Sequence, residues 1–205
     1  MPFLKDFLIN NSTKVILWKI IPGELDETHL NEEDKDLLKQ RKGKDSREYF
    51  LAVRKILDNE DSELMIDYDL NGKPFLNNQK GISISHSHEI VAIAISNEFD
   101  FGIDIQYKTD KIFKIQNKFL SQKESRSLKK NDEIDPLIKL WSAKESIYKA
   151  LGKKGVSFSN HLEIDTTNDN YLYRVGHYKK DNIKIKFELD FLYIEGYIIC
   201  YAKKS

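Results

Sequence analysis

The spacing of apolar and polar residues along the chain changes repeatedly between the period of a strand and that of a helix. Residues 14–21, KVILWKII, predict a first strand. Residues 30–58 predict a long helical region that is broken near Gly43, and its second part carries an apolar stripe at helical spacing. Residues 71–76, NGKPFL, predict a turn, because Asn-Gly and the following proline restrict the backbone.

Three apolar segments follow and predict three further strands. ISISHSH, residues 82–88, alternates strictly and therefore places three serines on one face, namely Ser83, Ser85 and Ser87. EIVAIAIS, residues 89–96, is apolar on both faces, as expected of a central strand. In FGIDIQ, residues 101–106, Asp104 and Gln106 share the face opposite the apolar side chains.

Two helix starts can be identified in the second half of the chain. Ser121 and Glu124 have the spacing of a capping box. Asp135 is expected to be the N-cap of a second, amphipathic helix, with Pro136 at its first position and a glycine at its end. The remaining segments alternate strand-like patterns with polar turns; they are residues 161–165, 171–178, 183–194 and 197–203. This mixed order predicts an α+β fold.

Composition narrows the classes of partner. The 205 residues suit one compact unit or two small halves, and 40% hydrophobic residues suffice for a core. A formal net charge of +0 gives no overall field for nucleic acid or an anionic membrane, so any anion site must be built locally. The single cysteine, Cys200, and the lack of a long apolar segment lead us to expect a cytoplasmic protein without a membrane anchor.

The amphipathic helix that follows Asp135 places charges in and beside its apolar face. That face consists of Leu137, Leu140, Trp141, Ile147, Tyr148 and Leu151. Lys144 points from its centre, and Glu145 and Lys149 are i,i+4 neighbours on its flank. Lys144 could lay its stem across apolar surface, and Glu145 with Lys149 could be an ordinary surface pair. Alternatively, Asp104 and Glu145 could share a hard cation such as Mg²⁺, if the fold brings them together.

Two other short patterns suggest different chemistry. Ser146 and Lys149 form S-x-x-K, the arrangement of some serine–lysine acyl-transfer enzymes, but the partner motifs of that class are missing. His86 and His88 form H-x-H, which can bind zinc, but no third ligand lies suitably near in the sequence. A role as a hydrogen-bond donor to a phosphate suits His86 better than a role as a zinc ligand, with Ser85 beside it.

A basic segment precedes these strands. It contains Lys39, Arg41, Lys42, Lys44, Arg47 and Arg54. Such a segment is usually a solvated helix face, but it could hold a multiply phosphorylated small molecule, since guanidinium and ammonium groups suit phosphate. Lys73, in the turn Gly-Lys-Pro, is a further candidate for such a contact.

Taken in order, the segments GKPFL, ISISHS, FGIDIQ, FLSQKE and LWSAKESIYKALGKKG resemble the 4′-phosphopantetheinyl transferase family, of the Sfp-like two-lobed type. The resemblance runs from about Gly72 to Gly155. It implies two similar α+β halves packed as a pseudo-dimer, residues 1–101 and 102–205, with the catalytic motifs in the second half and coenzyme A between the halves.

The resemblance also implies a reaction. The phosphopantetheine arm of coenzyme A would be transferred, with Mg²⁺, to a serine of an acyl or peptidyl carrier protein, releasing 3′,5′-adenosine bisphosphate. The partners would be coenzyme A and the carrier, with neither nucleic acid nor membrane, and the protein would be a monomer. A protein of the same fold that binds coenzyme A without turnover is the alternative.

For the reaction centre, the resemblance implies that Asp104 and Glu145 bind the metal. Glu145 could also act as the base, and Lys149 would contact the phosphate under attack. Lys144 would point toward the coenzyme A cleft. Gln106 stands where the family often has an acidic third ligand, so either its amide oxygen or a water would complete the metal site.

For coenzyme A, the resemblance implies five further contacts. Ser85 and His86 match a phosphate-contacting pair, and Lys73 would lie near the adenosine phosphates. Arg47 and Arg54 are expected to contact the 3′-phosphate.

Overall fold

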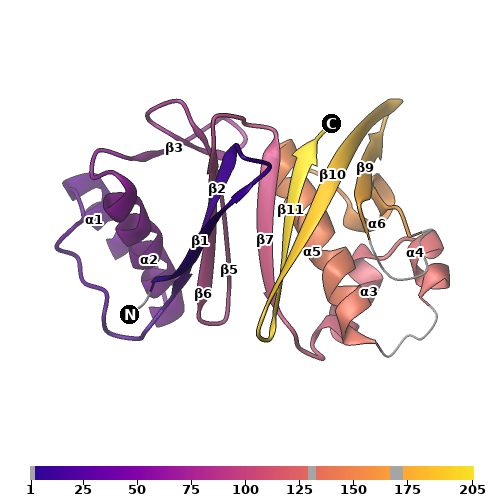
Figure 1. Cartoon of the computed structure of the whole chain (residues 1–205), viewed down its shortest axis with the longest axis horizontal. Coiled ribbons are helices and arrows are strands. Elements are labelled where there is room, and N and C mark those ends of the chain that lie inside the picture. Colours follow the sequence, from indigo (N-terminus) through magenta and orange to yellow (C-terminus); the bar gives the residue numbers. More distant parts are fainter. Residues whose placement is uncertain (1–2, 129–132, 167–172) are drawn as a thin grey trace.

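The computed structural model describes residues 3–128, 133–166 and 173–205. Two antiparallel sheets face each other in the middle of the molecule, and helices cover the outer face of each (Figure 1). The predicted α+β class is confirmed. Among the described residues, no helix combines the length and the apolar character that crossing a bilayer requires.

The first sheet and its helices occupy the N-terminal half. The sheet has the order β1-β2-β6-β5-β4-β3, with the strands β1 (Phe3–Ile9), β2 (Thr13–Lys19), β3 (Ile66–Tyr68), β4 (Pro74–Leu76), β5 (Gly81–Ser87) and β6 (Ile90–Ser96). The helices are α1 (Glu32–Lys39) and α2 (Lys44–Glu60). Gly43 precedes α2 with a φ of 93°, so the predicted break in the helical region is confirmed. Strand β1 was not predicted, because most of its side chains are exposed and show no apolar alternation.

The second sheet has the order β7-β11-β10-β9-β8. Its strands are β7 (Phe101–Tyr107), β8 (Leu162–Ile164), β9 (Val175–Lys180), β10 (Ile183–Ile194) and β11 (Tyr197–Lys204). Its helices are α3 (Ile112–Phe119), α4 (Gln122–Ser127), α5 (Ile134–Leu151) and α6 (Phe158–His161). The strand predicted over residues 171–178 begins at Val175, and residues 171–172 lie outside the described part.

The helix starts were predicted with mixed success. The capping box of Ser121 and Glu124 is present at the start of α4. The predicted start of α5 is wrong by two residues, because Glu133 is the N-cap. Asp135 lies inside the first turn, where its carboxylate accepts a hydrogen bond from Lys108 at 2.7 Å. At the other end Gly152 closes α5 with a φ of 56°, as a terminal glycine commonly does.

The two sheets repeat one topology. In each, a strand is followed by helices and then by four strands, the last of which pairs with the first: β2 with β6, and β7 with β11. The predicted pair of similar halves is therefore confirmed, with β1 as an addition to the first sheet. The boundary between residues 101 and 102 stays a prediction; β7 itself begins at Phe101.

Of the four apolar cores formed by the described residues, three lie between these layers. One lies between the two sheets and contains the inward side of β7, namely Phe101, Ile103 and Ile105. The other two lie between each sheet and its covering helices. The predicted apolar face of α5 packs in the core of the second half. This leaves the opposite side of β7, which carries Asp104, directed toward α5.

Candidate active site where α5 crosses β7

Asp104 is the centre of a hydrogen-bonded cluster at the edge of the second sheet. Its side chain is 3% exposed. Its Oδ1 accepts hydrogen bonds from Ser85 Oγ at 2.8 Å and from Lys149 Nζ at 2.9 Å. Its Oδ2 accepts one from Gln106 Nε2 at 3.0 Å. The carboxylate is held from three elements, β5, β7 and α5, and its direction is therefore fixed.

Helix α5 brings Lys149 and Glu145 to this carboxylate. Lys149 also donates to the carbonyl of Ile103 at 3.0 Å, so its ammonium bridges the edge of β7. Burial, together with the charge of Asp104, raises the pKa of Glu145 to about 7, and Lys149 opposes this shift. The i,i+4 pair of α5 is thus a partly buried arrangement facing Asp104, and the prediction that the fold unites Asp104, Glu145 and Lys149 is supported.

The close approach of α5 to β7 depends on Gly102. A Cβ at this position would lie 2.1 Å from the carbonyl oxygen of Ser146 and 2.9 Å from the Cβ of Lys149. Glycine is therefore required where the helix crosses the strand, two residues before Asp104.

The oxygen atoms of this cluster fit a hard cation. Asp104 and Glu145 are two carboxylates close enough to raise the pKa of Glu145, which a divalent cation would relieve. Gln106 presents its amide nitrogen to Asp104, so it acts in this structure as a hydrogen-bond donor, and its role as a ligand stays a prediction. Over the described residues, no set of three or more His, Cys, Asp or Glu side chains is arranged around a common metal position. This also gives no support to the zinc alternative.

The orientation predicted for Lys144 is wrong. Its side chain is fully buried in the second half, away from the cluster, and its three protons are all used. They go to the carbonyls of Phe119 at 2.7 Å and Phe158 at 2.9 Å and to the carboxylate of Glu124 at 2.6 Å. The helical periodicity correctly predicted that Lys144 lies on the core side of α5, whereas the resemblance wrongly directed it toward the coenzyme A cleft.

The serine–lysine alternative does not fit the structure. Ser146 is fully buried, and its hydroxyl contacts the carbonyls of Ser142 and Cys200, both at 2.8 Å. Lys149, three residues later, is directed to Asp104 instead. A hydroxyl with neither solvent access nor a neighbouring base is not a nucleophile.

Ser85 and His86 do not act as a pair, because neighbouring residues of a strand face opposite sides. Ser85 faces the second sheet, and its proton is given to Asp104. His86 faces α2, where its ring stacks on Tyr49 with centroids 3.7 Å apart. Loss of hydration lowers the pKa of His86, and the nearby charge of Lys149 adds to the effect. His88 lies in the turn after β5 with a φ of 49°.

A pocket of about 150 Å³ lies beside the cluster and is lined by both halves. Lys73, Lys149 and Lys153 line it, and no acidic residue does. Lys73 donates to the carbonyls of Phe99 at 2.5 Å and Ala150 at 2.7 Å. Lys73 therefore also ties the turn before β4 to the end of α5, and a Cβ on Gly152 would meet its stem at 2.6 Å.

A second cationic pocket, of about 420 Å³, is formed by α2, the loop after α1, β3 and β5. Arg41, Arg54 and His86 line it together with Tyr49. Arg54 is nearly buried and pairs with Asp34 at 2.8 Å. Arg41 lies over the Phe50 ring, with its guanidinium carbon 4.7 Å from the centroid.

Arg47 does not line these pockets. Its guanidinium donates to the carbonyl of Leu38 at 2.8 Å and pairs with Glu27 at 3.0 Å. Its predicted contact with a phosphate therefore has no support here. In the sequence, Arg41 was named only as one member of the basic segment, and Tyr49 was not named. Only the packing of α2 on β5 shows which side chains of this segment face the pocket.

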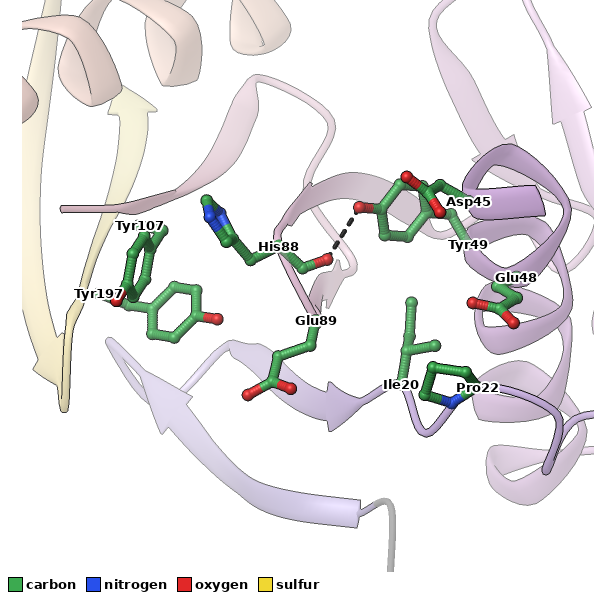
Figure 2. Close-up of a pocket in the computed structure, with 9 residues that line it drawn as sticks. All are labelled: Ile20, Pro22, Asp45, Glu48, Tyr49, His88, Glu89, Tyr107 and Tyr197. Carbon is green, nitrogen blue, oxygen red and sulfur yellow. Dashed lines mark hydrogen bonds between the residues drawn. The ribbon is translucent and has the colours of Figure 1, made fainter. Parts of the chain in front are cut away.

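A third pocket, also of about 420 Å³, has the opposite charge (Figure 2). Asp45, Glu48 and Glu89 line it, without any lysine or arginine. Tyr107 and Tyr197 approach from the second sheet, and Tyr49 from α2 on the other side. The Tyr49 hydroxyl donates to the His88 carbonyl at 2.8 Å, which joins α2 to the turn after β5 within the first half. Tyr49 separates this acidic pocket from the one lined by Arg41.

Comparisons with known proteins match the part of the chain that contains this cluster. The model of the 4′-phosphopantetheinyl transferase superfamily matches residues 100–202, half of the chain. A curated relative, 4′-phosphopantetheinyl transferase gsp of Aneurinibacillus migulanus, is 39% identical over 85 residues. That match covers 40% of this chain and only 35% of the relative's own length. The family match contains Asp104, Glu145 and Lys149.

Proposed function

The chain belongs to the 4′-phosphopantetheinyl transferase superfamily, and we propose that it is an enzyme that transfers the phosphopantetheine arm of coenzyme A to a carrier-protein serine. The observation that carries the proposal is the cluster of Asp104, Lys149 and Glu145 where α5 crosses β7. It combines the fixed carboxylate of Asp104 with a second carboxylate and an ammonium group, which suits displacement at a phosphorus atom.

Coenzyme A would occupy the two cationic pockets. Its phosphates need local positive charge in a chain with a formal net charge of +0. Lys73 and Lys153 supply it in the smaller pocket, and Arg41 and Arg54 in the larger one. Ile84 lines both pockets, so a ligand could extend from one to the other along β5.

The carrier protein would approach from the third pocket. Its carboxylates disfavour the phosphates of coenzyme A, and its tyrosines offer a surface that can bury apolar groups of a protein partner. Tyr107 ends the same strand that carries Asp104. The pocket therefore lies next to the reaction centre, on the side opposite Lys73.

In the reaction, the serine hydroxyl oxygen of the carrier would form a bond to the phosphorus that bears the pantetheine arm. The bond from this phosphorus to the bridging pyrophosphate oxygen would break, and 3′,5′-adenosine bisphosphate would leave. Glu145 would accept the serine proton, directly or through a water. Lys149 would offset the charge that develops on the phosphoryl oxygens.

Asp104 and Glu145 would hold Mg²⁺. When bound, this cation would neutralise pyrophosphate charge and align the reacting groups. Gln106 would hold the second oxygen of Asp104 in place, as its present hydrogen bond does.

The proposal is tested by following the released nucleotide chromatographically. The protein is incubated with coenzyme A, Mg²⁺ and an apo carrier, and 3′,5′-adenosine bisphosphate should appear only when all three are present. Lys149→Met should greatly slow its release. Tight coenzyme A binding without any release, across a panel of apo carriers, would identify a binding protein instead. A cytoplasmic location and a monomeric state stay predictions.

A further inference from the structure

Three serines of β5 join the two sheets at one seam. The hydroxyl oxygens of Ser83, Ser85 and Ser87 accept hydrogen bonds from the backbone amides of Ile103, Ile105 and Tyr107, at 2.9, 3.2 and 2.9 Å. Both strands advance two residues between contacts, so the spacing follows from the period of a strand. We call this set of three contacts the serine seam.

The serine seam provides hydrogen-bond acceptors for the backbone amides along one edge of β7, which would otherwise have none. Strand β7 is the edge of the second sheet, and only its other side pairs with β11. Its outward amide groups need acceptors, because unpaired buried N–H groups are costly. Side-chain hydroxyls of β5 take the place of a neighbouring strand, and Lys149 donates to the outward carbonyl of Ile103.

Ser85 differs from the other two serines in one respect. It also donates its proton to Asp104 Oδ1 at 2.8 Å, and the residue is 6% exposed. The amide of Ile105 occupies one lone pair of the hydroxyl, and this contact helps to direct the single proton toward Asp104. The same side chain therefore contacts the seam and the reaction centre.

We propose that Ser85 is a positioning residue that couples the docking of the two halves to the orientation of the Asp104 carboxylate. When β5 and β7 are in register, Ser85 fixes Oδ1 beside Lys149. If the register is lost, Asp104 loses the Ser85 contact. Replacing a group that orients a metal-binding side chain typically lowers metal affinity or activity by about 10- to 100-fold. The magnesium part of this inference rests on the proposed function, and the coupling of Ser85 to Asp104 does not.

The seam offers matched controls for the test. Ser83→Ala and Ser87→Ala each remove an amide contact alone, while Ser85→Ala removes an amide contact and the contact with Asp104. Each variant is made in the natural chain and in an Asp104→Ala background, and urea unfolding is measured without metal. We expect Ser85→Ala to shift the unfolding midpoint less than half as far in the Asp104→Ala background, and the two controls to shift it equally in both backgrounds. An equal shift for Ser85→Ala in both backgrounds would overturn the coupling.

A second measurement tests the role at the site. In the transfer assay, Ser85→Ala should raise the Mg²⁺ concentration for half-maximal rate about tenfold or more, whereas Ser87→Ala should leave it unchanged. Equal Mg²⁺ requirements for these two variants would overturn the positioning role. If the natural chain shows no transfer at all, the proposed function fails, while the unfolding result still decides the coupling.

Discussion

The ammonium nitrogen of Lys144 lies 2.6 Å from Glu124 Oε2, and both side chains are completely buried. Glu124 also accepts from the amides of Ser121 and Ile164, both at 2.8 Å. One carboxylate thus joins the start of α4 to β8 and to α5. This ion pair holds together the helical layer of the second half and lies outside the reaction centre.

Replacing Lys144 with methionine should destabilise the protein strongly. The change leaves the charge of Glu124 buried without its cation, which typically costs about 3–5 kcal/mol. Urea unfolding measures the loss. Lys139→Met, on the same helix but partly exposed, is the control and should cost much less. Coenzyme A affinity of the folded Lys144→Met protein should be unchanged, and a loss of affinity at unchanged stability would contradict the structural role.

Patterns among residues close in sequence predicted much of the second half of the molecule, since its helices and strands show the expected spacing of apolar residues. The apolar face of α5, the alternation in β5 and β7, and the capping box at Ser121 depend on neighbours in sequence and were correct. Lys144 shows the limit of this reasoning. Its partner Glu124 is 20 residues away, and no local pattern indicates that the two charges meet in a core.

The sequence pattern alone could identify only some of the residues of the candidate site, and the others follow from tertiary packing. Asp104, Glu145 and Lys149 could be selected from the sequence, but the separation of Ser85 from His86 and the position of Arg41 could not. They depend on which face of β5 meets α2 and which meets β7. For the same reason, Arg47 and Arg54 were equally good candidates for a phosphate contact in the sequence, although of the two only Arg54 lines the larger cationic pocket.

The raised pKa of Glu145 predicts a dependence of stability on pH. Its pKa rises from the ordinary value of 4.5 to about 7 on folding. Between these values the folded state binds more protons than the unfolded state, so the free energy of unfolding falls as pH rises through this window. Glu145→Gln should remove this decline and should be more stable than the natural chain above about pH 7.

Urea unfolding across this pH range, in the presence of a chelator, measures the effect. Glu188→Gln, at an exposed position on β10, should keep the decline of the natural chain. An unchanged pH slope in Glu145→Gln would show that Glu145 is not the group responsible.

Alanine at position 102 should displace α5 from β7. The added Cβ would lie 2.1 Å from the Ser146 carbonyl, and crowding of this kind commonly costs about 1–3 kcal/mol. Turnover should fall as well, because Glu145 and Lys149 move with the helix. Gly155→Ala is the comparison, since only its φ of 71° opposes the change and no atom lies within 4 Å. Unchanged turnover in a folded Gly102→Ala protein would contradict the importance of this close approach.

The two arginines Arg41 and Arg47 should differ in their effect on coenzyme A binding. Arg41 lines the larger cationic pocket, whereas Arg47 is held by Leu38 and Glu27. Arg41→Ala should weaken binding by about tenfold or more, since hydrogen bonds to charged groups contribute roughly 1.5–3 kcal/mol. Arg47→Ala should leave the affinity nearly unchanged.

Titration calorimetry with coenzyme A and with 3′-dephospho-coenzyme A measures both effects. If Arg41 contacts the 3′-phosphate, Arg41→Ala should lose affinity for coenzyme A and little for the dephosphorylated ligand. A larger loss for Arg47→Ala than for Arg41→Ala would restore the assignment made from the sequence.

The mass of an apo carrier protein tests the central claim most directly. After incubation with this protein, coenzyme A and Mg²⁺, intact-mass spectrometry should show the carrier heavier by one phosphopantetheine group. A carrier whose target serine is replaced by alanine should gain nothing, and Lys149→Met should slow the gain on the natural carrier greatly. An unchanged carrier mass across fatty-acid, polyketide and nonribosomal-peptide carriers, with the protein folded and coenzyme A bound, would contradict the account.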